Sequence, residues 1–356
     1  MHRACSAFEL DMKTFLGELQ SADDLARCAA TVQWAATAYP DSALFALCEA
    51  ELHACQHNLD AGCAVMERIL HLPCIAELQA LGAVVAHKRG VYSLACLKWL
   101  QAAACFESGL EVYRRAGRRS LAPASAMNAA LSYLVGGADA EAEAMLAVVA
   151  SYQQIDKSNW GRQDRNAFRL LARYREAGYQ RGRSDVASGG GGSVEESPPA
   201  ASTAQQFALL ELGLLMSLGF RCTWWMTDAS CDGFREELHA LDFRSADERA
   251  QRSVILSQMC VHRGRYAEGI AVSGLALEEA GALSEAAVSL GLGPLLQCLT
   301  AQLHGALGQP HKAEQALKAA EAYGKGYLWV RVPWPAYESC IGHWRTHRWR
   351  AALPTI

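Results

Sequence analysis

The feature that most constrains the fold is a pair of stretches near the C-terminus that repeat one design 44 residues apart. The first covers residues 263–270 and the second covers residues 307–314. In each stretch a glycine ends an apolar helix, a short turn follows, and a small residue opens the next helix. Repetition at such a period is typical of a solenoid of helical hairpins, so the sequence predicts an all-α fold. Stacked helix pairs usually hold other protein chains, which argues against an enzyme.

The same hairpin register is found in two earlier segments, residues 43–72 and 124–150. On the inner face of each second helix, small or branched apolar residues fall at matching places, where small side chains let two helices approach closely. The aligned pairs are Gly62 with Ala142, Ile69 with Val149, Gly269 with Ala313, and Ala276 with Ala320. A further hairpin is predicted over residues 80–117, with its turn near residues 103–105 and with Phe106 and Gly109 opening its second helix.

Composition limits the class of protein. Of the 356 residues, 51% are hydrophobic and 8% aromatic, which indicates a folded chain, and the net charge of −4 favours neither nucleic-acid binding nor an acidic tail. The 13 cysteines are odd in number and form no C-x-x-C pair, so we expect free thiols in a reducing, cytoplasmic compartment. The opening residues hold no secretory signal. The longest apolar run, residues 207–220, contains Glu211 and is too short to cross a bilayer, so no transmembrane segment is predicted.

Composition changes between residues 182 and 206, where glycine, serine, proline and acidic residues replace the helical pattern. Such a segment cannot bury enough apolar area to fold, so it is predicted to be a disordered insert. The predicted organisation is therefore helical hairpin repeats over residues 1–181, this insert, C-terminal repeats over residues 207–344, and a tail over residues 345–356.

The hairpins are degenerate and unevenly spaced, whereas tetratricopeptide repeats usually span about 34 residues. Four segments carry a resemblance to one family with such repeats. The first two are residues 97–119, with Trp99 and Cys105, and residues 124–179, with an arginine-rich helix ending at Tyr174. The other two are residues 256–276, with a Gly-Arg-Tyr turn, and residues 296–337, with Tyr323 and Tyr327. In their order these segments resemble the tetratricopeptide repeat protein 39 family, which includes the fungal inclusion-body clearance proteins. Two departures are a shorter N-terminal helical region and the tryptophans and prolines of residues 329–335, which replace an expected helix.

The resemblance implies an α-solenoid of degenerate tetratricopeptide-like hairpins that acts as a non-enzymatic scaffold or adaptor. Members of the family are linked to lipid homeostasis through regulated protein degradation, to clearance of misfolded protein, and to cilium formation. The expected partner is therefore a protein, whose identity the resemblance does not supply. No cofactor is implied.

The candidate partner-binding residues lie in an arginine-rich segment, residues 157–183. Four of its arginines recur at steps of three and four and so line one face of a helix: Arg162, Arg165, Arg169 and Arg173. Guanidinium groups can bind carboxylates or phosphates bidentately, so this face suits an acidic partner. The alternative is a solvated face whose arginines pair with acids on a neighbouring repeat, where each surface pair contributes about 0–1 kcal/mol.

Other candidate sites are weaker. Residues 343–350 interleave aromatic and basic side chains, as a base-stacking or membrane-surface segment would, but we favour a frayed tail at the chain end. His53 and His57 have the i, i+4 spacing of a metal-binding pair, but a site needs further converging ligands and none is evident. No nucleophile motif, paired acids or phosphate-binding glycine loop can be identified, so no catalytic, cofactor or metal residues are predicted.

Two alternative functions stay open. An all-α enzyme or hydrophobic-ligand carrier would use an aromatic-lined pocket between residues 207–225 and the C-terminal aromatics, lined by Trp224, Trp225, Trp329 and Trp334. Such aromatics also fill ordinary cores, where each contributes about 2–3 kcal/mol. An RNA-reading helical repeat is disfavoured by the acidic balance and the uneven repeat length.

Overall fold

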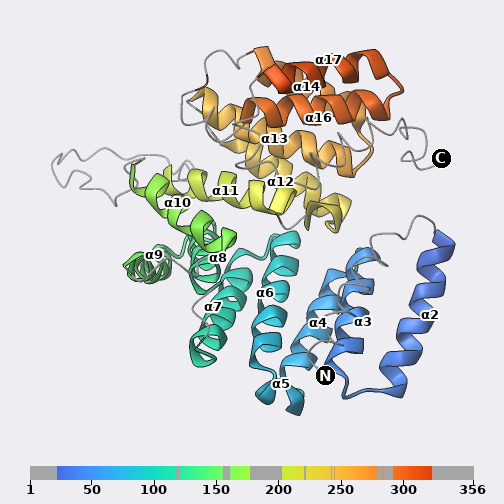
Figure 1. The fold of residues 1–356 in the computed structure, drawn as a ribbon, viewed down its shortest axis with the longest axis vertical. Coiled ribbons are helices and arrows are strands. Elements are labelled where there is room, and N and C mark those ends of the chain that lie inside the picture. The colour runs from blue at the N-terminus through green and yellow to red at the C-terminus, as the bar shows by residue number, and fades with distance from the viewer. Residues whose placement is uncertain are drawn as a thin grey trace, which may run out of the picture. The chain divides into compact units, whose positions relative to one another are not determined.

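The computed structural model describes residues 22–117, 121–154, 161–176, 203–219, 222–241, 243, 245–278, 283 and 292–322. Within these ranges every regular element is a helix (Figure 1). The predicted all-α class is therefore confirmed for this part of the chain. Residues 182–202 of the predicted insert (182–206) and the segments beyond residue 322, including Trp329, Trp334 and residues 343–356, lie outside it, whereas residues 203–206 are helical and not part of a disordered insert.

The described residues divide into two compact units, one up to Leu209 and the other from Leu210 onward. The first unit contains α2 (Ala22–Ala38), α3 (Ala43–Cys55), α4 (Leu59–Leu70), α5 (Pro73–Glu77), α6 (Gln79–Ala95), α7 (Trp99–Arg115), α8 (Ala122–Val135), α9 (Asp139–Gln153) and α10 (Arg162–Glu176). The division falls within α11 (Thr203–Leu214), which begins at Thr203, four residues before the predicted resumption of helix at Phe207.

The second unit continues from α11 through two short helical turns into five further α-helices in the described part of the chain. It contains a π-helical turn (Leu215–Gly219), a 3₁₀ turn (Cys222–Trp224), α12 (Asp228–Ala240), α13 (Ala246–His262), α14 (Tyr266–Glu278), α16 (Leu292–Ala306) and α17 (Pro310–Ala322). No helix in the described part of the chain is both long enough and apolar enough to cross a membrane.

Helices that follow one another in the sequence pack together within each unit. In the first unit α3 packs on α4, α4 on α6, α6 on α7, α7 on α8, and α8 on α9 (Figure 1). In the second unit α13 packs on α14, α14 on α16, and α16 on α17. Each pair therefore buries its apolar side against the next, and the core is built from serial layers of neighbouring helices.

Five of these helix pairs are joined by the same three-residue turn. The middle residue of each turn has a left-handed backbone, with φ between 58° and 75°: His57, Leu97, Gly137, Gly264 and Gly308. The following N–H group donates back to the carbonyl five residues earlier, as in Lys98 to Ser93 at 2.9 Å and Gln309 to His304 at 2.9 Å. This is the Schellman motif, which ends a helix and reverses the chain. The two predicted glycine turns, at Gly264 and Gly308, belong to this set.

These five hairpins also share one packing register. Five residues after each left-handed position, the second helix carries a buried glycine or alanine: Gly62, Ala102, Ala142, Gly269 and Ala313. Seven residues before it, the first helix carries a buried small residue: Ala50, Gly90, Ala130, Ser257 and Ala301. A Cβ atom on Gly62 would lie 3.2 Å from the backbone oxygen of Ala50, so the two helices touch where both side chains are small.

The predicted turn near residues 103–105 is wrong. Helix α7 runs without a break through these residues, and the turn lies at residues 96–98. The position that holds glycine in three of the other hairpins is Leu97, with φ 58°, so no glycine or proline marks the turn in the sequence. Phe106 and Gly109 are buried within α7, where they occupy the places of Met66 and Ile69 in α4.

Replacing Gly308 by alanine should isolate the cost of the left-handed turn. A Cβ atom there would meet no other atom within 4 Å, while φ is 69°, so only the backbone conformation is penalised. We expect Gly308→Ala to lower the free energy of unfolding by about 1 kcal/mol, measured by urea denaturation. The reciprocal change His57→Gly, at the same place in the α3–α4 turn, should raise it by a similar amount. If Gly308→Ala and wild type had equal unfolding free energies, the left-handed conformation at residue 308 would impose no cost on alanine.

Candidate functional site

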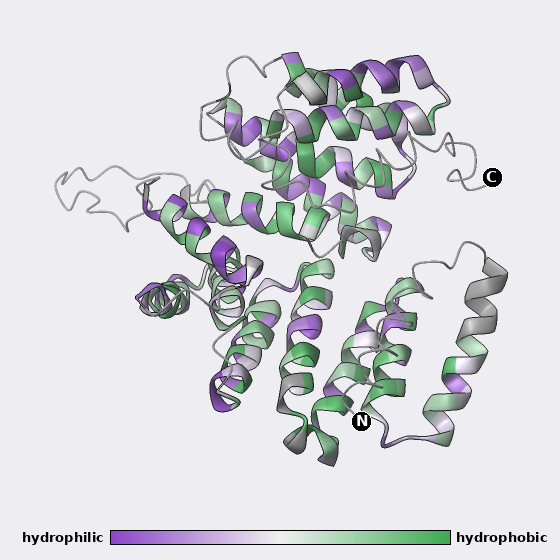
Figure 2. Ribbon diagram, viewed as in Figure 1, coloured by the Kyte–Doolittle hydropathy of each residue, from purple (hydrophilic) through white to green (hydrophobic). Residues whose placement is uncertain are grey.

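The arginine-rich helix α10 is attached to the first unit by one apolar face. Ala167, Phe168 and Leu171 are buried on that face, and α10 packs against α8 and α9. The opposite face carries the charged residues, and Figure 2 shows α10 largely in hydrophilic colours while α11 is largely hydrophobic. Burial of one side therefore fixes which arginines face solvent.

Asp164 lies on the buried face of α10 and has 0% of its surface exposed. Its carboxylate accepts hydrogen bonds from the N–H groups of Gly161 at 3.1 Å and Leu121 at 2.9 Å. Burial raises the pKa of Asp164 above its ordinary value, while these backbone donors and Arg165 act in the opposite direction. One side chain thus caps the N-termini of two helices and joins them.

The predicted arginine stripe is divided by the structure. Arg165 and Arg169 are exposed, whereas Arg173 is half-buried with its guanidinium 5.6 Å from the ring centroid of Phe207. That distance is typical of a cation–π contact, so Arg173 also helps hold the start of α11. Arg162 opens α10, but its side chain lies outside the described part of the structure.

Four other cations in the first unit differ from these two arginines because a carboxylate on a neighbouring helix pairs with each of the four. Arg68 pairs with Glu49 at 2.5 Å, and Arg89 pairs with Glu67 at 2.8 Å. The same holds for Lys88 with Glu51 and for Lys98 with Asp60 at 2.6 Å. Among the described residues no carboxylate lies within ion-pair distance of Arg165 or Arg169. In this part of the chain the only carboxylate that acts on Arg165 is the buried Asp164, which is not in ion-pair contact with it.

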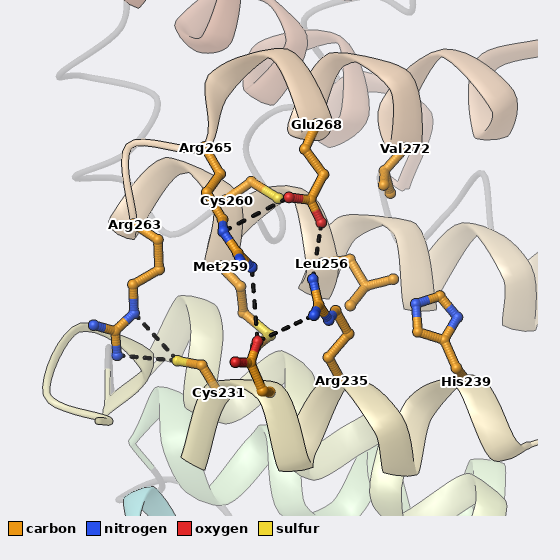
Figure 3. A pocket seen from close by; sticks show the side chains of 11 residues that line it. Cys231, Arg235, His239, Leu256, Met259, Cys260, Arg263, Arg265, Glu268 and Val272 are labelled. Carbon is orange, nitrogen blue, oxygen red and sulfur yellow. Dashed lines mark hydrogen bonds and ion pairs between the residues drawn. The ribbon is translucent and has the colours of Figure 1, made fainter. Parts of the chain in front are cut away.

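A hollow in the second unit lies between α12, α13 and α14 (Figure 3). Four side chains form a closed ring of alternating charge across it, here called the charge ring: Asp232, Arg235, Arg265 and Glu268. Arg235 lies 3.1 Å from both Asp232 and Glu268, and Arg265 lies 3.7 Å and 3.8 Å from the same two acids. The charge ring neutralises itself and ties α12 to α14.

The hollow does not suit an organic ligand. Its volume is about 40 Å³, which accommodates one or a few water molecules, whereas sites for organic ligands span roughly 300–1,000 Å³. Its two thiols are also unreactive in character, because burial raises the pKa of Cys231 and raises that of Cys260 to about 11. Arg263 donates to the Cys231 sulfur at 3.0 Å and to the carbonyl of Met226, and so closes one end of the hollow.

Comparisons with protein-family models, with curated proteins and with solved structures find no match for this chain. The resemblance to the tetratricopeptide repeat protein 39 family therefore stays a hypothesis based on the residues quoted above.

The predicted histidine pair does not have helical i, i+4 geometry. His53 lies in α3, which ends at Cys55, and His57 is the left-handed residue of the following turn. The two side chains therefore leave the backbone in unrelated directions. No group of three or more potential metal ligands occurs among the described residues.

The aromatic-lined pocket can be followed only in part. Trp225 is half-buried, while Trp329 and Trp334 and the side chain of Trp224 lie outside the described residues. Nearby, His262 lies with Nδ1 2.8 Å from the Thr223 hydroxyl and with Nε2 2.7 Å from the Gln258 side chain. The Nδ1 contact joins the 3₁₀ turn to α13, whereas the Nε2 contact lies within α13.

Asp164 is the functional position that sequence reasoning missed. Its place three residues after Gly161, in the first turn of an expected helix, is a signal for an N-terminal capping acid. The hydrogen bond to Leu121, 43 residues away, has no local signal.

Proposed function

We propose that this chain is a non-enzymatic scaffold of degenerate tetratricopeptide-like hairpins that binds partner proteins. The observation that carries the proposal is the shared register of five hairpins, with matching Schellman turns and matching small residues in both helices. The second helix of the α6–α7 hairpin, with Ala102 four residues before Phe106, follows the A-x₃-F pattern of tetratricopeptide repeats. Stacked hairpins of this kind present extended surfaces on which other chains are held.

The distribution of polar groups supports binding rather than catalysis. In the described residues the most concentrated set of charges, the charge ring, is self-neutralised, and the hollow beneath it is water-sized. Arg165 and Arg169, which form no ion pair with a described carboxylate, lie instead on an exposed helix face. Ten cysteines of the described part are free thiols, which agrees with the reducing, cytoplasmic setting that we propose. Roles in protein degradation, clearance of misfolded protein or cilium formation belong to the proposal only through the family resemblance.

A binding role predicts a stoichiometric complex that survives reconstitution. Proteins enriched with the tagged full-length chain should be identified by mass spectrometry, then purified and titrated against it by calorimetry. We expect at least one partner to bind at a fixed ratio and to slow amide hydrogen exchange in exposed segments of the hairpin helices. An unrelated helical protein of similar size is the control bait. Enrichment no greater than with that bait, or protection confined to residues beyond 322, would refute the scaffold role.

A further inference from the structure

We propose that Arg165 and Arg169, on the exposed face of α10, bind a carboxylate-rich segment of a partner protein. The inference deepens the proposed scaffold function by naming the chemistry of the partner and the place where it binds. The two residues are hereafter the arginine face.

The arginine face has no ion-pair partner in the described part of the chain. Elsewhere in the first unit, Lys and Arg side chains that cross between helices meet carboxylates, as Arg68 meets Glu49 and Arg89 meets Glu67. On α10 the acid nearest in sequence to the arginine face, Asp164, is fully buried and is used as a helix cap. Among the described residues the arginine face therefore has no partner acid, and an external one would complement its charge.

The two guanidinium groups of the arginine face are spaced along the helix axis. Residues four apart on a helix lie about one turn, or roughly 6 Å, apart along its axis, so Arg165 and Arg169 project side by side. Carboxylates that are one turn apart on a partner helix, or two residues apart on an extended chain, have a similar spacing. A single phosphate would instead need guanidinium groups that converge on one point. The linear arrangement thus favours several carboxylates in a row.

The helix that carries the arginine face is held in place by contacts along its length. Asp164 fixes the start of α10, and Ala167, Phe168 and Leu171 bury its inner side. Arg173, stacked on Phe207 at 5.6 Å, holds its C-terminal end. Because the helix is ordered before binding, the partner does not have to supply the free energy of ordering it.

The test uses the purified full-length chain and a fluorescein-labelled oligoglutamate peptide, with binding followed by fluorescence anisotropy at low ionic strength. The variant Arg165→Glu/Arg169→Glu reverses the arginine face. The matched control is Arg114→Glu/Arg115→Glu on α7, which changes the net charge equally at exposed arginines that pair with Glu111 at 4.0 Å and 3.2 Å. A third variant, Arg165→Lys/Arg169→Lys, keeps the charge but removes the bidentate fork.

We expect the reversed arginine face to weaken oligoglutamate binding about tenfold or more, and the control to stay within about twofold of wild type. The lysine variant should fall between them, and added salt should weaken wild-type binding. Circular dichroism melting curves of all variants should coincide, because the changed side chains are exposed.

Three results would overturn the inference: equal losses in the reversed and control variants, no loss in either, or tighter binding of a phosphoserine peptide or a single-stranded RNA homopolymer than of oligoglutamate. The scaffold function is tested separately. A reconstituted partner that binds the Arg165→Glu/Arg169→Glu variant as well as wild type would remove the inference and leave the scaffold intact.

Discussion

Replacing Asp164 by alanine is expected to lower the free energy of unfolding of the first unit by about 3 kcal/mol. The reason is that two backbone N–H groups, of Leu121 and Gly161, lose their acceptor at a site where the replaced side chain is fully buried. Leu121 is also held in a left-handed conformation with φ 70°, which the hydrogen bond to Asp164 helps maintain. Urea denaturation should show the loss, and hydrogen exchange should accelerate first in α10 and at the start of α8.

The matched variant is Asp164→Asn, which keeps one acceptor oxygen of nearly the same shape. It should lose clearly less stability than the alanine variant, because part of the cap is preserved. Arg165→Ala serves as the surface control and should change the unfolding free energy by less than about 0.5 kcal/mol, since its side chain is exposed. Equal losses for the asparagine and alanine variants would contradict the capping role of the carboxylate oxygens.

Two glycines on α14 should respond in opposite directions to the same substitution. A Cβ atom on Gly269 would lie 2.9 Å from the Cys260 Cβ and 2.8 Å from a Leu303 methyl, so α14 would have to move away from α13 and α16. We expect Gly269→Ala to lower the unfolding free energy by about 1–2 kcal/mol, after the gain in helix propensity is subtracted from the overpacking cost. Urea denaturation, with hydrogen exchange in α13 and α14 to locate the change, provides the measurement.

The second glycine, Gly274, supplies the control for the first. A Cβ atom there would meet nothing within 4 Å, so Gly274→Ala changes only the backbone freedom of the unfolded chain and the helix. It should raise the unfolding free energy by about 0.5–1 kcal/mol. The two variants should thus differ by about 1.5–3 kcal/mol although the substitution is the same. If Gly269→Ala were as stable as Gly274→Ala, the close contact between α13 and α14 could not be required.

The sequence predicted correctly those features that depend on residues close together in the chain. Leu- and Ala-rich segments with helical periodicity predicted helices, and glycines at positions 264 and 308 predicted turns that the structure contains. In the hairpin at residues 79–115 only the turn was predicted at the wrong place, because Leu97 occupies the left-handed position without any sequence mark of a turn. Its neighbours pack well enough to hold it there, and propensity alone does not reveal that.

In the candidate site, too, the features set by nearby residues were predicted and those set by distant residues were not. Spacing alone placed Arg165, Arg169 and Arg173 on one helix face, since the helical repeat determines which residues share a side. The spacing did not indicate that Arg173 would stack on Phe207, because that contact joins segments that are far apart in the chain.

The sequence itself thus determined the all-α class, the register of the hairpins and the helix face that the arginines share. Each of these depends on residues within a few turns of one another. Three features were decided only by tertiary structure: the role of Asp164 as a cap on α8, the opposite roles of Gly269 and Gly274, and the lack of a described partner acid for Arg165 and Arg169. Each depends on which distant backbone or side chain comes within contact distance, and that is set when the helices pack together.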